Sequence, residues 1–230
     1  SLFARGVINS RFFFEVYVRA QREDRRIKAG RYQMNVGRSW ASIIRQLTRG
    51  EVMTEIVTIP EGFRLNQIAP RIARLSRESI ADVTSLLASP GLGEQLGVPG
   101  PGAEGYLFPD TYRFAEGVPV IRILSAMVER YHATWTPERR TRLSDLGMTE
   151  RELVTLASII QAEARLEQEM PHISGVFHNR LERGWLLQAD PTVTYALGGY
   201  RERLLFAAID SVADSPYNTY RRRGLPPGPI

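Results

Sequence analysis

The sequence has no cysteine, a single lysine and no long apolar run. Without cysteine the chain can form no disulfide, no thiolate nucleophile and no thiolate zinc site, and the redox compartment is left open. No stretch approaches the roughly 18 consecutive apolar residues that a membrane span requires. The opening SLFARGVINS also lacks the basic start and apolar core of a secretory signal. The 230 residues, 43% hydrophobic and 24% charged, have the composition of an ordinary globular protein.

The basic charge of the chain is carried almost wholly by arginine, since Lys28 is its one lysine. Residues 1–60 hold 11 basic and 5 acidic side chains, whereas residues 61–230 hold 19 and 20. A protein that binds nucleic acid gathers basic charge on one face of the fold. A basic excess confined to one short segment does not favour such binding, and we expect no nucleic-acid partner.

Hydrophobic periodicity predicts an α+β chain whose second part is mostly helical. The predicted helices cover residues 12–17, 40–47, 65–75, 79–87, 118–131, a segment from about 150, 173–181 and 203–210. The predicted strands cover residues 31–36 and 52–59, and short strands and turns are expected around LLQADPTVTYALGG. The stretch 89–105, rich in glycine and proline, is expected to be a loop.

Capping residues, glycine and proline predict where several of these helices begin and end. Ser39 and Thr149 are predicted N-caps, and Glu152 stands where a capping box needs it. Gly50 is the predicted stop of the helix that Ser39 begins. Pro171 is expected to end or kink the helix that begins near residue 150.

Glu163 is the most informative polar residue of the sequence. On a helical wheel it falls between Ile159 and Ile160, in the middle of an apolar stripe. A carboxyl group there loses hydration, which favours its neutral form. A carboxylic acid kept protonated near neutral pH is the group that general-acid chemistry on a glycosidic oxygen requires. The structural alternative is a glutamate whose head reaches water or an arginine.

Glu167 follows Glu163 by one helical turn, a spacing at which two carboxylates could share a proton or a metal ion. No histidine stands at helical spacing with them, and loops rich in aspartate are absent. We therefore expect neither a metal nor a cofactor. His132, His172 and His178 are interpreted as surface or packing residues.

Three segments interleave aromatic side chains with amides, hydroxyls and carboxylates. They are EGYLFPDTY (residues 104–112), LQADPTVTY (187–195) and SPYNTYRRRGLPPGPI (215–230). Aromatic faces stack on sugar rings while polar groups hold the hydroxyls, so such segments suit a glycan cleft. Taken singly, each could equally be a hydrogen-bonded turn plugged by aromatic rings.

Together with LASIIQAEA, these segments resemble the endolytic murein transglycosylases of the MltG/YceG-like family, over about residues 53–230. The stretch IKAGRY with the following GEV is similar to the LysM-like subdomain of that family. The resemblance implies a LysM-like subdomain over residues 1–52, truncated at its N-terminus. It implies a YceG-like catalytic domain over 53–230, truncated at its C-terminus. An N-terminal membrane anchor, absent from this chain, would precede both.

The resemblance also implies one catalytic glutamate on the LASI helix. Family members often have Glu-Lys-Glu after that motif, whereas this chain has Gln161-Ala162-Glu163. Glu163 is then the one candidate there that can carry a proton. The resemblance further suggests substrate-binding side chains along the cleft, namely Glu104, Gln188, Asp190, Tyr217 and Asn218.

The function implied is that of a lyase that cuts the β-1,4 bond between N-acetylmuramic acid and N-acetylglucosamine in nascent peptidoglycan. Its product would be a 1,6-anhydro end, and its action would terminate strand elongation. Expected partners are peptidoglycan strands and wall-synthesis enzymes, at the extracytoplasmic side of a bacterial inner membrane. Two alternatives stay open: a lysozyme-like hydrolase with Asp190 as its second carboxylate, and a non-catalytic peptidoglycan-binding scaffold.

Overall fold

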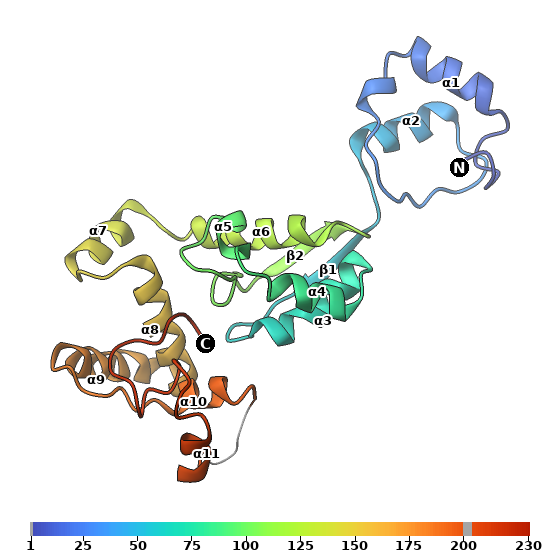
Figure 1. Cartoon of the computed structure of the whole chain (residues 1–230). Coiled ribbons are helices and arrows are strands. Elements are labelled where there is room, and N and C mark those ends of the chain that lie inside the picture. Colours follow the sequence, from blue (N-terminus) through green and yellow to red (C-terminus); the bar gives the residue numbers. More distant parts are fainter. Residues whose placement is uncertain (1, 200–203) are drawn as a thin grey trace.

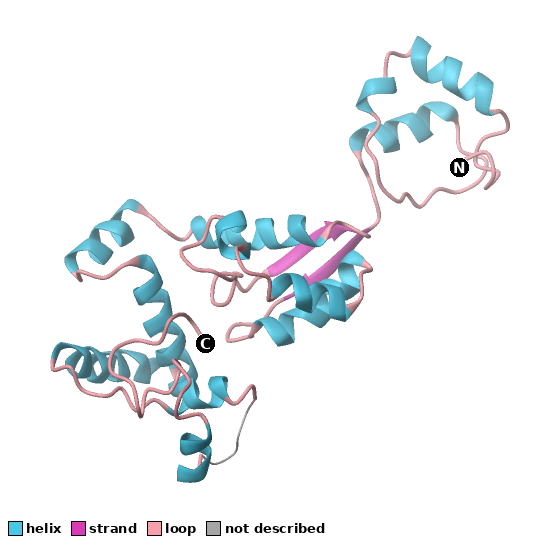
Figure 2. Cartoon of the chain, viewed as in Figure 1, coloured by secondary structure: helices cyan, strands magenta, loops and turns pink. Residues whose placement is uncertain are grey.

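The chain is arranged as three consecutive groups of elements in a computed structural model that describes residues 2–199 and 204–230 (Figure 1). The first group stands apart from the others and is joined to them by the segment leading into strand β1 (Thr54–Thr58). Each group has its own cluster of buried apolar side chains, built within residues 7–47, 57–131 and 156–189. Helices dominate, and the one sheet found among the described residues is small (Figure 2), which confirms the α+β class.

The first group contains α1 (Arg11–Ala20), η1 (Asp24–Arg26) and α2 (Trp40–Arg49). The predicted N-cap of α2 is confirmed, because the Ser39 side chain accepts a hydrogen bond from the backbone of Ser42. Gly50 ends α2 at φ 73°, a left-handed conformation that favours glycine. The rings of Phe14 from α1 and Trp40 from α2 pack edge to face, with their centroids 5.7 Å apart.

Residues 31–36, predicted as a strand, have no strand structure. A strand needs a neighbour to pair its backbone, and this segment lies beside helices. Its backbone is held at single points instead. The Arg31 carbonyl accepts from the backbone of Met53, and the Gln33 carbonyl accepts from the Gln46 side chain.

The central group has a two-stranded antiparallel sheet, β1 (Thr54–Thr58) and β2 (Thr111–Ala115). Around it lie α3 (Leu65–Ser76), α4 (Ile80–Leu87), α5 (Leu92–Leu96) and α6 (Val120–His132). The stretch 89–105 is therefore not wholly a loop, since it contains α5 with Leu92 buried. A Cβ at Gly93 would lie 1.9 Å from the Gly100 carbonyl oxygen, so the close backbone packing there requires glycine.

The third group is helical and carries the candidate site. It comprises α7 (Pro137–Asp145), α8 (Glu150–Glu163), η2 (Glu167–Glu169), α9 (Met170–Glu182), α10 (Asp190–Ala196) and α11 (Phe206–Ser211). The capping box of Thr149 and Glu152 at the start of α8 is confirmed. In the described part of the chain, no helix is both long and apolar enough to cross a bilayer.

Two predictions in this group are wrong. Pro171 neither ends nor kinks α8, which stops at Glu163; it lies in the first turn of α9, where a missing N–H costs nothing. The segment after Ala189 is not strands and turns but α10, with Pro191 in its first turn. The predicted helix over 203–210 starts at Phe206 within the described residues, and residue 203 lies outside them.

Candidate active site

Glu163 is the last residue of α8, held in place by the packing of the helix below it. Leu156 and Ile159 of α8 are buried in the third apolar cluster, against Phe177 and Leu187 among others. Ala164 then adopts an extended conformation and leads the chain away. Because the helix ends at Glu163, no further turn covers its side chain.

The expected enclosure of Glu163 among isoleucines is therefore wrong. Ile159 is fully buried and Ile160 is half-buried, but Glu163 as a residue is exposed. Even so, partial burial of its carboxyl group raises the pKa of Glu163, and the negative charge of Asp190 raises it further. The positive charge of Arg180 opposes both effects. The carboxyl is thus partly exposed to solvent and lies within electrostatic range of another carboxylate.

Asp190 is the first residue of α10, and its carboxylate accepts a hydrogen bond from the Tyr220 hydroxyl. Burial, followed by Asp190 and then Glu163, raises the pKa of Tyr220 to about 12. Tyr220 therefore stays protonated at neutral pH and remains a donor. Arg180 reaches the same region from α9 and donates to the buried Leu187 carbonyl.

The turn at Gln188 brings Asp190 beside the end of α8. Gln188 has φ 51°, a left-handed conformation that is uncommon for a residue other than glycine, and its side chain is exposed. Its backbone N–H donates to the Thr219 carbonyl at 3.1 Å. The Thr219 side chain accepts from the backbone of Ala189 and shares a hydrogen bond with the Thr192 hydroxyl. Strained backbone of this kind is typical of functional sites.

Asn218 supports this turn from inside the protein. It is fully buried, and its amide donates to the carbonyls of Ile209 at 2.8 Å and Val212 at 3.1 Å. Its side-chain oxygen accepts from the backbone of Tyr220. All these partners are backbone groups, so Asn218 positions the segment that carries Tyr217 and Tyr220 and does not itself face the solvent.

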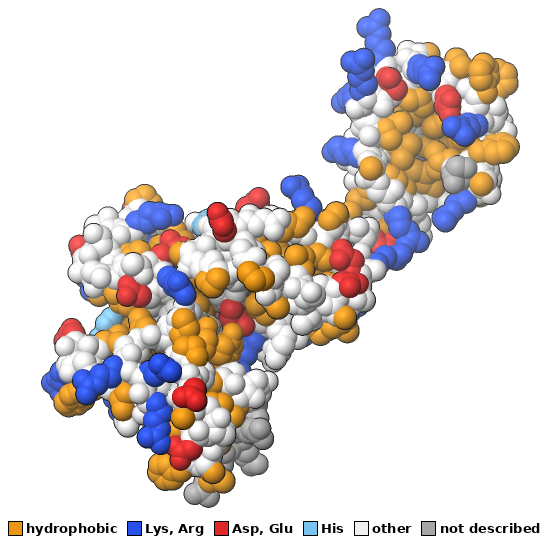
Figure 3. All heavy atoms as spheres, in the orientation of Figure 1, with side chains coloured by type: hydrophobic (Ala, Val, Ile, Leu, Met, Phe, Trp, Pro, Cys, Tyr) orange, Lys and Arg blue, Asp and Glu red, His pale blue; other side chains and the backbone are white. Residues whose placement is uncertain are grey.

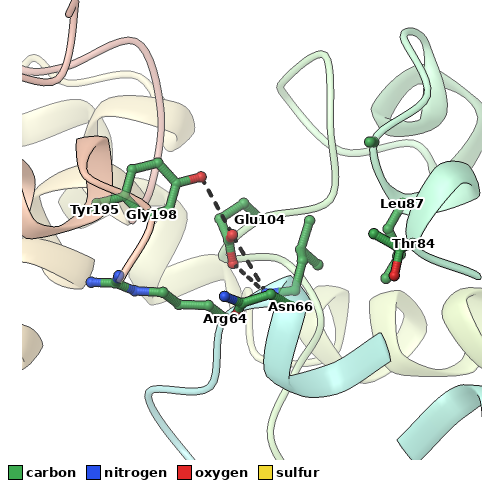
Figure 4. A pocket seen from close by; sticks show the side chains of 9 residues that line it. Arg64, Asn66, Thr84, Leu87, Glu104, Tyr195 and Gly198 are labelled. Atoms are coloured by element: carbon green, nitrogen blue, oxygen red, sulfur yellow. Dashed lines mark hydrogen bonds between the residues drawn. The ribbon is translucent and has the colours of Figure 1, made fainter. Parts of the chain in front are cut away.

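Glu104 lies in a separate cavity of about 370 Å³, whose wall includes Arg64, Thr84 and Tyr195 (Figure 4). Its carboxylate accepts from the backbone N–H of Leu65 at 3.2 Å and from the Tyr195 hydroxyl at 3.4 Å. Burial raises the pKa of Glu104, while the Leu65 N–H, Arg64 and Tyr195 oppose that rise. The Leu65 N–H and the Tyr195 hydroxyl hold the carboxylate in a fixed orientation, and the Arg64 guanidinium contributes a favourable positive charge.

Aromatic rings line the approach to Glu104. The Tyr195 and Tyr217 ring centres are 4.8 Å apart, and the Arg64 guanidinium lies 5.2 Å from the centre of the Tyr195 ring. Burial is the main cause of a raised pKa at Tyr217, with the charge of Glu104 second. Both tyrosines therefore remain neutral hydroxyl donors beside a carboxylate.

A second cavity of about 450 Å³ adjoins the first, because Leu65 and Glu104 border both. Its wall includes Gln161 from α8, Glu167 from η2 and the loop 105–109. The candidate residues thus fall into two groups. Glu104 lines both cavities and Tyr217 packs against Tyr195 in the wall of the first, whereas Glu163, Asp190 and Tyr220 lie together at the end of α8.

The helical spacing considered for Glu163 and Glu167 is not found, because α8 ends between them and Glu167 begins η2. Within the described ranges there is no cluster of three or more histidines and acidic residues that could hold a metal ion.

The sequence reasoning left four residues out of the candidate site: Arg64, Arg180, Tyr195 and Tyr220. Both tyrosines stand in segments whose mixture of aromatic and polar residues had already drawn attention. The arginines gave no signal, since nothing in the sequence distinguishes them from the other 27.

Comparison with known proteins finds one family that matches the chain over its whole length. The model of the YceG-like family matches residues 1–230. An endolytic murein transglycosylase of Bacillus subtilis is 33% identical, over 97% of this chain and 66% of the relative. An endolytic murein transglycosylase of Streptococcus pneumoniae serotype 2 is also 33% identical, over 89% of this chain and 42% of the relative. The chain thus spans less than two thirds of the length of either relative.

A solved structure of a YceG-like protein also matches nearly the whole chain. The crystal structure of a YceG-like protein from Listeria monocytogenes matches with a TM-score of 0.69 and 32% sequence identity. The match covers 99% of this chain and 79% of the Listeria chain.

Proposed function

This chain belongs to the YceG-like family, and from that premise we propose that it is the catalytic portion of an endolytic lytic transglycosylase. Its substrate would be peptidoglycan glycan strands, cut at the β-1,4 bond between N-acetylmuramic acid and N-acetylglucosamine. The names of the relatives from Bacillus and Streptococcus support this reading. Cleavage within a strand would terminate its elongation.

The observation that carries the proposal is the environment of Glu163. Partial burial and the charge of Asp190 both raise the pKa of its carboxyl group. A larger fraction of the carboxyl is then protonated near neutral pH than for an ordinary glutamate. In the first step Glu163 gives this proton to the glycosidic oxygen, and the bond to C1 of the muramic acid ring breaks.

The second step returns the proton. The C6 hydroxyl of the same ring attacks C1, which carries the developing positive charge, and the Glu163 carboxylate takes the hydroxyl proton. The product carries a 1,6-anhydro ring, and Glu163 is again protonated. Because the nucleophile comes from the substrate, the reaction needs no second carboxylate to activate water, unlike the common two-carboxylate hydrolases.

The remaining candidate residues would bind and orient the strand. Asp190, which accepts a hydrogen bond from Tyr220 and raises the pKa of Glu163, would stabilise the cationic ring by its negative charge. The exposed Gln188 amide, the cavity at Glu104 and the adjoining pair Tyr195 and Tyr217 would supply polar and aromatic surface for neighbouring sugars. Asn218 would act through the loop it braces.

We also propose that residues 1–52 form a LysM-like unit and that residues 53–230 form the catalytic domain. The separate apolar cluster of the first group supports this division. In the whole protein, the unit would keep the catalytic part beside strands as they are made, at the outer face of the cytoplasmic membrane. Wall-synthesis enzymes would be its protein partners, and an anchor preceding this chain would attach it.

The test is the mass of the products from purified glycan strands. We expect wild-type protein to release fragments ending in 1,6-anhydro-N-acetylmuramic acid and Glu163→Gln to release none. Fragments heavier by one water would indicate the hydrolase, in which Asp190 serves as the second carboxylate. Strand binding without any product would indicate the non-catalytic scaffold.

A further inference from the structure

Another cavity, of about 520 Å³, lies between the end of α6, the helix α7 and the start of α8. Its volume is typical of ligand-binding pockets. Part of the loop 105–109 lines both this cavity and the second cavity, so the two are neighbours. Within the described chain, none of the candidate site residues lines it. We call it the α7 cavity.

Most of the wall of the α7 cavity is apolar. Its aromatic and aliphatic side chains are Phe108, Pro109, Tyr131, Trp135, Leu143, Leu146, Leu153 and Val154. The two hydroxyl groups of the wall already have acceptors. Thr134 donates to the Tyr131 carbonyl at 2.7 Å, and the Tyr131 hydroxyl donates to Glu150 at 2.6 Å. A bound molecule would therefore meet mainly apolar surface.

The charged side chains in the described wall are both basic, Arg139 and Arg142, and no carboxylate lines it. Arg139 donates one hydrogen bond to the Thr134 carbonyl at 2.8 Å. Arg142 lies 3.9 Å from Asp145 in an exposed pair, and such pairs are weak. A guanidinium carries several N–H donors, so both arginines keep donors for an anion. Basic and apolar side chains both reach the surface over α7 (Figure 3).

We propose that the α7 cavity binds a single-chain amphiphile with an anionic head group. The alkyl chain lies among the rings of Phe108 and Trp135 and the aliphatic side chains of α7 and α8. The head group accepts hydrogen bonds from Arg139 and Arg142. Burial of the chain supplies most of the affinity, and the two guanidinium groups select the charge of the head.

Two other classes of ligand fit this wall less well. A peptide segment would bring backbone N–H and C=O groups into the cavity, where each unpaired group costs free energy. A glycan would bring hydroxyl groups that need partners in the same way. The hydroxyls of Tyr131 and Thr134 are already engaged, whereas an alkyl chain has no polar group along its length.

The experiment is isothermal titration calorimetry of the 230-residue chain with decyl phosphate below its micelle concentration. We expect decyl phosphate to bind at least about 10-fold more tightly than the uncharged decyl maltoside. Octyl phosphate should bind about 10-fold more weakly than decyl phosphate, because two fewer methylene groups are buried. Inorganic phosphate alone should give no measurable heat. Circular dichroism at the same concentrations checks that the chain stays folded.

The double variant Arg139→Gln/Arg142→Gln tests the head-group contacts. It should bind decyl phosphate at least about 10-fold more weakly and decyl maltoside as the wild type does. Both arginines are exposed, so the fold should be kept. The matched control is Arg74→Gln/Arg122→Gln, which removes the same charge from exposed positions on α3 and α6 outside the cavity. It should bind both ligands as the wild type does.

Tryptophan fluorescence places the ligand. Trp135 stands in the wall of the cavity, whereas Trp40 and Trp185 do not. Decyl phosphate should shift the emission of the wild type to shorter wavelength. Trp135→Phe should lose that shift while the calorimeter still records binding.

The proposal would be overturned by any of four results. Decyl maltoside could bind as tightly as decyl phosphate, which would leave no selection for an anion. The variant at Arg139 and Arg142 could match its control, which would place the anion elsewhere. The fluorescence shift could persist in Trp135→Phe, which would place the chain elsewhere. A peptide of alternating leucine and glutamate could bind more tightly than decyl phosphate, which would assign the cavity to a protein partner. All four measure binding and not cleavage, so they are independent of the function proposed for Glu163.

Discussion

The Tyr220 hydroxyl donates a hydrogen bond to Asp190, the carboxylate whose charge helps to raise the pKa of Glu163. The three residues come from three separate segments, a C-terminal loop, the start of α10 and the end of α8. The positive charge of Arg180 from α9 lowers the pKa of Glu163 and so opposes the effect of Asp190. Besides burial, two neighbours of opposite sign thus act on the pKa of Glu163, and each can be removed on its own.

Glu163→Gln should reduce strand cleavage by at least about 10²-fold, because glutamine can neither give nor take the proton. The fold should be intact, since Glu163 is exposed at a helix end. The control is Glu182→Gln, which changes an exposed carboxylate on α9 and should leave cleavage unchanged. Near-normal turnover by Glu163→Gln would move the chemistry to another residue.

Asp190→Asn should shift the pH dependence of kcat/KM. The pKa of Glu163 is raised, so activity falls as pH rises through that value, because the first step needs the protonated acid. Removing the negative charge lowers the pKa, and the falling limb should move to lower pH. At acidic pH, kcat/KM should fall by less than about 10²-fold if Asp190 only positions the substrate and transfers no proton. Asp214→Asn, at an exposed aspartate, is the control.

Arg180→Gln should move the same limb in the opposite direction. Loss of the positive charge removes the influence that lowers the pKa of Glu163, so the acid stays protonated to higher pH. Glutamine is shorter than arginine, so the buried Leu187 carbonyl loses its donor and the stability should fall by about 1–2 kcal/mol. A limb that moves to lower pH, or does not move, would mean that Arg180 does not act on Glu163.

Asn218→Ala should destabilise the protein by about 2–3 kcal/mol, because two buried carbonyls and one N–H lose their partner. Urea denaturation measures this loss. Asn179→Ala, at an exposed position on α9, should change stability by less than about 0.5 kcal/mol. A similar small effect at Asn218 would show that the loop is held by other contacts.

Gly105→Ala should lower the thermal stability of the protein. Gly105 lies in the wall of the second cavity, next to Val154 of α8. Gly105 has φ +79°, and an added Cβ would lie 2.4 Å from Pro229. The left-handed backbone alone costs about 1–3 kcal/mol for a residue with a Cβ. Gly175→Ala in α9 meets no neighbour within 4 Å and should stabilise the helix by up to about 1 kcal/mol. Thermal melting of both variants should therefore show shifts of opposite sign.

The local features of the site could be predicted from the sequence. The start of α8 follows from Thr149 and Glu152, and the raised pKa of Glu163 was expected from its apolar neighbours. The exposure of Glu163 could not be predicted, because a helical wheel does not tell where the helix ends. The part that Asp190 and Arg180 play depends on contacts between segments, which one sequence does not reveal.

Short elements were also predicted wrongly from the sequence. Helix α10 has seven residues, too few for a period to be recognised, and its Asp-Pro start also suits a turn. Residues 31–36 had the composition of a strand, but pairing decides whether a strand forms. In both places the arrangement of distant segments outweighed local preference.

The three apolar clusters of the chain also bear on the order of folding during synthesis. Each is built from residues close together in the sequence, within 7–47, 57–131 and 156–189. A nascent chain can therefore bury one cluster before the next has left the ribosome, and domains generally fold in this order, N-terminal first. Contacts of short sequence separation form quickly. The end of α8, the start of α10 and the loop of Tyr220 all fall in the last segment, so the site is assembled after the first two clusters can be buried.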